Sequence, residues 1–147
     1  MMKRSAFTLV ELLIVVIILG ILAAVVIPQF SDASTDARLS ALTTNLQTIR
    51  GQISLYQLQH NGSYPEQTTF SDQMTKKTDA DGTVNASGKF GPYLQRIPNN
   101  PFTVGGTGND VTNSSAAINK AWYYEATTGE FKANDGGMTS GVNHDSL

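Results

Sequence analysis

An apolar segment near the start of the chain, from Phe7 to Ile27, contains one ionisable residue, Glu11. About twenty helical residues cross a hydrocarbon core of about 30 Å, so the segment is long enough to span a membrane. Lys3 and Arg4 precede it, which predicts a cytoplasmic N-terminus and an outward C-terminal domain. An acid in such a segment costs on the order of a few kcal/mol unless it finds a partner, and the segment has no Lys, Arg or His.

The partner of Glu11 must therefore come from elsewhere. A cut between Ala6 and Phe7 would create a free α-amino group, whose ordinary pKa is about 8, one helical turn before Glu11. Pairing within the chain would neutralise the acid. Pairing with the amine of a neighbouring subunit would also couple this neutralisation to assembly. The alternative is that the side chain extends to the polar edge of the membrane on its own.

The end of the apolar segment carries two features that affect its helix. Gly20 and Ala24 are four residues apart, a spacing of small side chains that lets helices approach closely. Pro28 lacks a backbone N–H and crowds the carbonyl of Ala24. We therefore expect a kink or weak point between Gly20 and Pro28. The alternative is that the helix ends at Gln29.

Beyond the proline, apolar side chains recur at steps of three and four residues: Leu39, Leu42, Leu46, Ile49, Ile53 and Tyr56. This spacing predicts an amphipathic helix. The pattern covers about three heptads without charged pairs beside the seam, so we expect it to pack on a sheet of its own domain rather than form a free coiled coil. Polar residues, with Arg38 and Arg50, occupy the other face. The helix should end at His60-Asn61-Gly62.

The chain after this helix, up to residue 102, predicts short elements. The four-residue step between Phe70 and Met74 predicts a helix over 69–76, and an Asp-rich turn follows at 79–82. Three prolines then predict a rigid, extended connector. Three apolar side chains should hold this connector on the core: Leu94, Ile97 and Phe102.

The last third of the chain predicts a loop and a hairpin. Residues 103–119 are rich in Gly, Asn, Ser and Thr, which favours a loop. Alternating aromatic residues in 121–125 and 130–134 flank a four-residue turn and predict a β-hairpin. The polar tail after Asn134 is expected to be mobile. The fold class is therefore α+β: a long N-terminal helix, half transmembrane and half amphipathic, packed on a small antiparallel sheet.

The N-terminus also resembles a known processing signal. Lys3-Arg4-Ser5-Ala6, followed by Phe7-Thr8-Leu9-Val10-Glu11-Leu12-Leu13-Ile14, resembles the class III signal of type IV pilins and type II secretion pseudopilins. The resemblance implies cleavage before Phe7 by a prepilin peptidase, N-methylation of Phe7, and pairing of Glu11 with a neighbour's N-terminus during assembly. The family nearly always has Gly before the cut, where this chain has Ala6.

Two further segments, 56–65 and 93–102, resemble the major (G-type) pseudopilins, with a helix end at Asn-Gly, a Tyr-Pro pair and a proline-bounded connector. The G-type resemblance implies calcium in a C-terminal loop, held by carbonyls and an acidic pair. This chain offers Asp135 and Asp145 there but lacks the acidic run. We therefore expect no cofactor, with these two acids as the only calcium candidates.

Composition and motifs give no sign of catalysis or nucleic-acid binding. The formal charge is −2, and loss of Lys3 and Arg4 with the leader would make it −4, so no basic patch is expected. The chain has no Cys, and its two histidines, His60 and His144, lie in no ligand-spaced cluster. No nucleophile triad, phosphate loop or dinucleotide motif occurs. We predict that the chain is not an enzyme.

The resemblance divides the chain into a cleaved leader (1–6), a transmembrane assembly helix (7–28), the amphipathic half of that helix (29–61) and a globular periplasmic head (62–147). It implies a structural subunit of a type II secretion pseudopilus, which polymerises to drive protein export. The implied partners are further copies, other pseudopilins, the prepilin peptidase and an assembly platform, and the implied location is the bacterial inner membrane, crossed once.

Two other functions remain open from the sequence. A type IV pilin for adhesion, motility or DNA uptake would have the same N-terminus, although the missing cysteines and the G-type connector favour secretion. A soluble exported binding domain would require an ordinary signal peptide cut near Ala24. Glu11 and the regular helix after Pro28 argue against that reading.

Overall fold

The computed structural model describes residues 7–103, 108–114 and 120–147. The predicted leader, including Ala6, lies outside the described residues. The chain forms two compact units, Met1–Ala37 and Arg38–Leu147.

One helix, α1 (Leu9–Gln59), belongs to both units. It is helical at position 28 as well, so the alternative that the helix ends at Gln29 is wrong. A proline removes one donor, and the turns on either side still hold the helix together. A kink between Gly20 and Pro28 stays a prediction.

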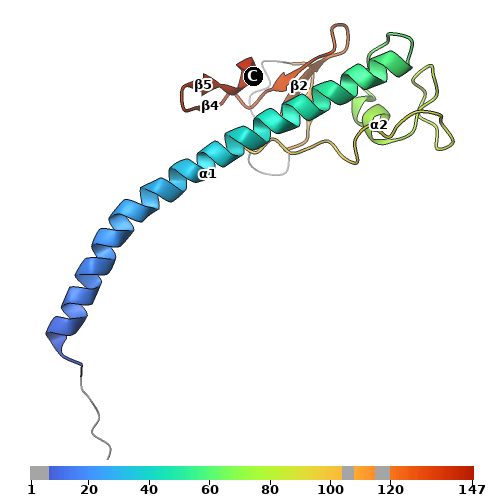
Figure 1. Cartoon of the computed structure of the whole chain (residues 1–147). Helices are drawn as coiled ribbons and strands as arrows, with labels where there is room; N and C mark the ends of the chain where they lie inside the picture. The colour runs from blue at the N-terminus through green and yellow to red at the C-terminus, as the bar shows by residue number, and fades with distance from the viewer. Residues whose placement is uncertain (1–6, 104–107, 115–119) are drawn as a thin grey trace, which may run out of the picture. The chain divides into compact units, whose positions relative to one another are not determined.

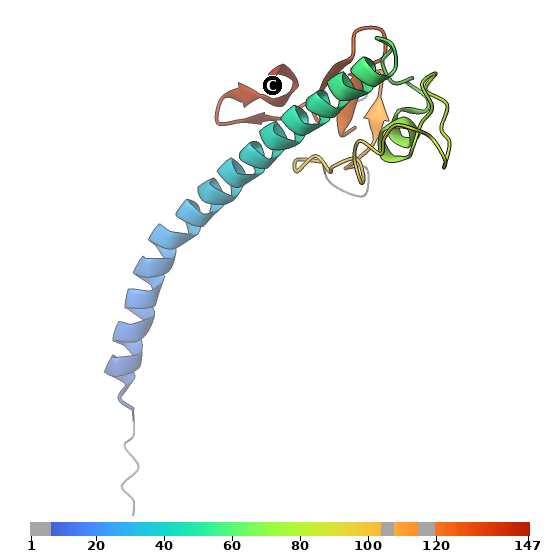
Figure 2. The ribbon, with the colours of Figure 1, turned by 45° about the vertical axis from the view of Figure 1, so that its right-hand side comes forward.

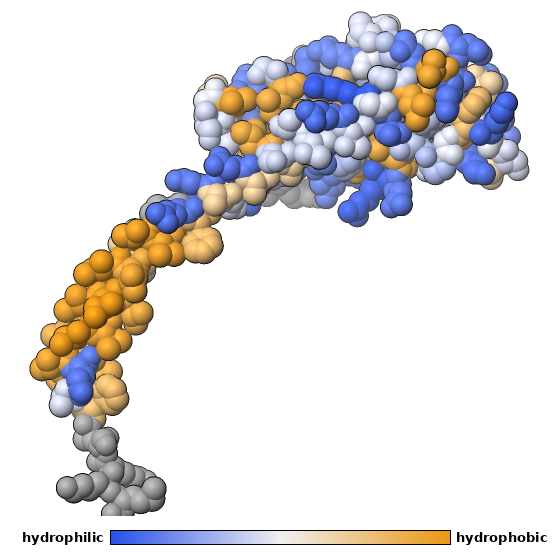
Figure 3. All heavy atoms as spheres, viewed as in Figure 1, coloured by the Kyte–Doolittle hydropathy of each residue, from blue (hydrophilic) through white to orange (hydrophobic). Residues whose placement is uncertain are grey.

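In the first unit, α1 exposes apolar side chains on every side. Leu12, Ile18 and Ile27 are each more than half exposed, and Figure 3 shows this part of the helix as a nearly continuous apolar surface. By length and composition the helix can cross a membrane. A helix that is apolar all round requires lipid or other helices around it.

In the second unit, the apolar stripe of α1 builds the core. Leu39 is partly buried, and the other side chains of the stripe are at most 2 % exposed: Leu42, Leu46, Ile49, Ile53 and Tyr56. They form one cluster with the sheet residues Trp122, Tyr124 and Phe131, and Figures 1 and 2 both show this half of α1 beside the sheet. The prediction that the stripe packs on its own domain is confirmed.

The helix ends as the sequence predicted. Asn61 and Gly62 both adopt positive φ, 56° and 87°. The N–H of Gly62 donates to the carbonyl of Gln57 at 2.9 Å, which satisfies one of the last carbonyls of α1. The short predicted helix is also present as α2 (Phe70–Thr75), and both Phe70 and Met74 are buried.

The sheet contains the predicted hairpin and one strand that the sequence did not indicate. β2 (Trp122–Glu125) pairs antiparallel with β3 (Glu130–Ala133), with Tyr124 opposite Phe131. β1 (Val111–Thr112) pairs parallel with β2 on its other edge, inside the segment expected to be a loop. The sheet is therefore mixed rather than purely antiparallel. The connector lies on the core as predicted, since Leu94 and Ile97 are buried in it and Phe102 is partly buried against it.

The prediction of a mobile tail after Asn134 is wrong. β4 (Met138–Thr139) and β5 (Val142–Asn143) form a second hairpin, and the 3-10 helix η1 (His144–Ser146) follows. His144 is 1 % exposed. Short polar segments become ordered when their side chains find buried partners, which composition alone does not reveal.

Arg50 also differs from expectation. It was placed on the polar face of the helix, but it is partly buried. Its Nε donates to the carbonyl of Phe131 at 2.8 Å, and its Nη2 donates to the backbone oxygen of Leu147 at 2.6 Å. One charged side chain of α1 therefore binds β3 and the last described residue together.

Candidate assembly site

Thr8 and Glu11, three positions apart, hydrogen-bond each other at the start of α1. The backbone N–H and the hydroxyl of Thr8 each donate to Oε2 of Glu11, both at 2.8 Å. The N–H of Glu11 lies 3.3 Å from Thr8 Oγ1. This reciprocal arrangement is a capping box, with Thr8 at the N-cap position. The sequence signal was Thr8-x-x-Glu11, and sequence reasoning that considered only charge missed it.

The capping box provides hydrogen-bond donors for the Glu11 carboxylate within a single chain. N–H groups at a helix start otherwise lack acceptors, and the carboxylate supplies one there. Phe7, one residue before the cap, is 73 % exposed. A free amine at Phe7 would therefore lie close to a carboxylate whose position is already fixed. Cleavage and methylation at Phe7 stay predictions.

The other predicted assembly residues lie further along the same helix. A Cβ added at Gly20 would meet no atom within 4 Å, so this surface of the helix is open in a single subunit. Pro28 is helical in its backbone. The roles of Gly20 and Pro28 in helix packing stay predictions.

The two calcium candidates are not brought together as a ligand pair. The side chain of Asp135 is bound by His144 at 2.8 Å and by Asn100 at 2.7 Å. Asp145 lies in η1, and its N–H donates to the side chain of Asn143. Within 7–103, 108–114 and 120–147, no three His, Cys, Asp or Glu side chains gather as a metal ion would require.

His60 has a structural place at the end of α1. Its ring stacks on Tyr56 with centroids 3.7 Å apart. Nδ1 lies 2.8 Å from the carbonyl of Tyr56, so this nitrogen donates, and Nε2 lies 3.0 Å from the hydroxyl of Thr78. Both ring nitrogens therefore have partners inside the head.

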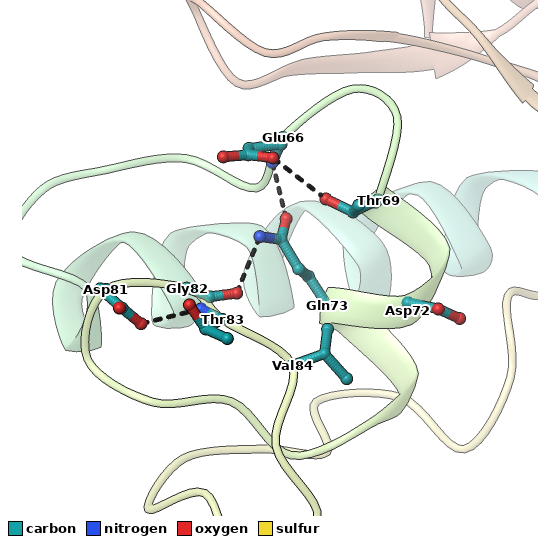
Figure 4. A pocket seen from close by; sticks show the side chains of 8 residues that line it. All are labelled: Glu66, Thr69, Asp72, Gln73, Asp81, Gly82, Thr83 and Val84. Atoms are coloured by element: carbon teal, nitrogen blue, oxygen red, sulfur yellow. Dashed lines mark hydrogen bonds between the residues drawn. The ribbon is translucent and has the colours of Figure 1, made fainter.

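A hollow of about 340 Å³ lies beside α2 and is lined mostly by polar side chains, with Val84 among them (Figure 4). The side chain of Gln73 accepts from the N–H of Glu66 at 2.7 Å and donates to the carbonyl of Gly82 at 2.9 Å. The N–H of Thr83 donates to Asp81 and is the main cause that lowers the pKa of this exposed carboxyl. These polar groups are hydrogen-bonded to one another, so they give no sign of a ligand site in the hollow.

The chain is similar to several known proteins. Residues 1–27 match the family model described as the prokaryotic N-terminal methylation motif. Over 100 residues the chain is 32 % identical to the type II secretion system core protein G of Pseudomonas aeruginosa, which covers 68 % of this chain and 69 % of that protein. The protein of the same name in Vibrio cholerae is 31 % identical over 110 residues, 75 % of this chain and 70 % of that protein.

The chain belongs to the type II secretion system core protein G family. This confirms the resemblance to the major pseudopilins, and the α+β fold with one long N-terminal helix agrees with it. The type IV major pilin protein PilE1 of Neisseria gonorrhoeae is also similar, with 34 % identity over 79 residues, 54 % of this chain and 47 % of that protein. No solved structure matches the chain significantly.

Family membership explains why the first half of α1 is apolar and exposed. The chain is a pseudopilin, a class of filament subunit anchored by its N-terminal helix. The N-terminal match ends at residue 27, where the apolar segment ends too. The methylation motif therefore covers the exposed, apolar start of α1.

Proposed function

We propose that this chain polymerises into a type II secretion pseudopilus, and that growth of the filament drives protein export. The observation that carries the proposal is Glu11, a single acid held at the start of a membrane-length apolar helix. A filament would surround that helix with copies of itself. Burial of apolar surface and neutralisation of Glu11 by the amine of a neighbour would then both favour assembly.

The proposed processing and location follow from the charges that flank the helix. Lys3 and Arg4 favour a cytoplasmic N-terminus, so the head would lie in the periplasm and the chain would cross the inner membrane once. Prepilin peptidase would cut after Ala6 and leave an N-methylated Phe7. Other pseudopilins and an inner-membrane assembly platform would be the remaining partners. We assign no catalytic step to the chain, so the work of assembly would come from an ATPase elsewhere.

Glu11→Gln tests the pairing directly. Glutamine keeps an oxygen that can accept the bonds from Thr8 but carries no charge. We expect normal membrane insertion. We also expect at least a roughly tenfold loss of sheared filaments, which corresponds to a loss of about 1.4 kcal/mol in the free energy of assembly. The matched control is Asp36→Asn, which removes an exposed acid from the same helix. Normal filament yield from Glu11→Gln would reject the pairing.

A surface pilus is the second candidate function, and the similarity to a type IV major pilin favours it specifically. The N-terminal helix serves both kinds of filament. Deletion of the gene separates them: loss of exported proteins from the medium with surface pili unchanged supports secretion. Loss of surface pili, seen by electron microscopy, with export unchanged supports the pilus.

A further inference from the structure

The C-terminal segment 135–147, here called the latch, is closed by a buried pair of polar side chains. The side chains of Asp135 and His144 are 4 % and 1 % exposed, and Oδ1 of Asp135 lies 2.8 Å from Nδ1 of His144. A carboxylate only accepts, so the ring N–H at Nδ1 is the donor. The other ring nitrogen, Nε2, lies 2.8 Å from the hydroxyl of Thr139 in β4.

Asp135 receives two further N–H donors from different parts of the head. The N–H of Gly137 donates to Oδ1 at 2.7 Å, and the amide nitrogen of Asn100 donates to Oδ2 at 2.7 Å. Asn100 also donates to the carbonyl of Ala121, just before β2. One carboxylate therefore joins the connector to two parts of the latch, Gly137 just before β4 and His144 in η1.

The space around this pair is already filled. The ring of Phe102 lies 4.2 Å from that of His144, between centroids. A Cβ placed at Gly137 would lie 2.7 Å from both Asp135 Oδ1 and His144 Nδ1, closer than real Cβ contacts allow. The backbone at Gly137 thus approaches the pair as closely as an unsubstituted residue permits.

This arrangement does not fit the calcium site that the family resemblance implies. Calcium takes six to eight oxygen ligands. Both oxygens of Asp135 accept N–H donors, which a cation would have to displace. Of the two candidate acids, only Asp145 has a covered oxygen without a hydrogen-bond partner, Oδ1, so the two acids do not form the acidic pair that the resemblance implies.

We propose that His144 takes the structural place of a metal ion in this chain, so that the latch closes through the His144–Asp135 pair and the head folds without calcium. The inference does not depend on the kind of filament that the chain forms. It would make the stability of the head insensitive to the calcium level of its surroundings.

The first test uses the full chain in detergent micelles, with calcium chloride or with a chelator. We expect the same Tm in both, no heat of calcium binding by titration calorimetry, and slow hydrogen exchange at the N–H of His144, which donates to the carbonyl of Gly137. A Tm that rises with calcium, or exchange in the latch that speeds up in chelator, would overturn the proposal.

The second test separates the contribution of the His144–Asp135 pair from that of the acidic side chains alone. His144→Asn and Asp135→Asn should each lower Tm by roughly 5–10 °C in either buffer, and the double variant should lose less than the sum. Asp145→Asn is the control and should lose nothing. Additive losses, or an unchanged Tm in His144→Asn, would contradict the proposal. If both pair variants fail to fold, Thr139→Val takes their place in the Tm measurement, because it removes only the hydroxyl partner of the His144 ring. The hydrogen-exchange measurement on the wild type then completes the test.

Discussion

The hydroxyl of Thr8 lies 2.8 Å from the same oxygen of Glu11 that accepts the Thr8 backbone N–H. The single acid of the apolar segment thus already has hydrogen-bond partners in its own chain, at the start of α1, without a neighbouring subunit. Under the proposed pairing, assembly would bring a neighbour's positive charge to a carboxylate that Thr8 already orients. Thr8 positions Glu11, and its contribution can be separated from the charge of Glu11.

Thr8→Val should loosen the first turn of α1 while leaving the charge of Glu11 in place. Loss of an N-cap side chain costs about 1 kcal/mol, so exchange at the N–H groups of the first turn should accelerate about fivefold. Hydrogen exchange in micelles measures this. Thr8→Ser keeps the hydroxyl and is the matched control. Equal exchange in the two variants would show that the capping box does not hold the first turn.

Arg50→Met should destabilise the head. The change keeps most of the aliphatic stem but leaves the carbonyls of Phe131 and Leu147 without this donor, at a cost of about 2 kcal/mol. Urea unfolding followed by Trp122 fluorescence measures the difference. Arg38→Met on the exposed surface of the same helix should change the free energy of unfolding by less than about 0.5 kcal/mol.

Leu46→Ala and Leu58→Ala make a matched pair on α1. Leu46 is 1 % exposed and Leu58 is 80 % exposed. The buried site should lose about 2–5 kcal/mol through a cavity, and the exposed site close to nothing. Thermal unfolding of the two variants measures this. Similar losses at both sites would mean that the stripe of α1 does not face the core as described.

The apolar stripe, the end of α1 and the hairpin were predictable because their signals are local. Leu42 and Leu46 are apolar at helical spacing, Asn61-Gly62 permits positive φ, and alternation marks β2 and β3. The latch was not predictable for the opposite reason. Asp135 is buried by donors at positions 100, 137 and 144, and no short window of sequence contains all of them.

The candidate assembly site was predictable in its chemistry but not in its geometry. Charge and hydropathy singled out Glu11, whereas its first partner, Thr8, follows from helix-capping rules. Arg50 was misplaced because a helical wheel assigns a charged residue to water. The carbonyls that it binds, on Phe131 and Leu147, come from the other end of the chain.

Alkaline pH should weaken the head through Tyr56. Burial, with smaller effects of Tyr93, Glu66 and Asp81, raises the pKa of Tyr56 from its ordinary 10.0 to about 12. A raised pKa means that the folded state resists loss of the proton, so this stability is complete below pH 10 and is lost as pH rises through about 12. The free energy of unfolding, measured by urea across this range, should fall by roughly 2 kcal/mol for this group.

Tyr56→Phe is the control for that measurement, because it removes the titrating hydroxyl and keeps the ring. Its stability should fall less steeply above pH 10 than that of the wild type. Burial also raises the pKa of Tyr124, so some decline should remain in the variant. Identical pH profiles for the two proteins would exclude Tyr56 as a cause.

The mass of the N-terminal peptide of the mature protein, purified from membranes of a bacterium that makes prepilin peptidase, tests the central claim most directly. The account predicts a chain that begins with N-methylated Phe7, so that a free amine lies one helical turn from Glu11. A mature chain that retains residues 1–6, or one that begins near Val25, would contradict it.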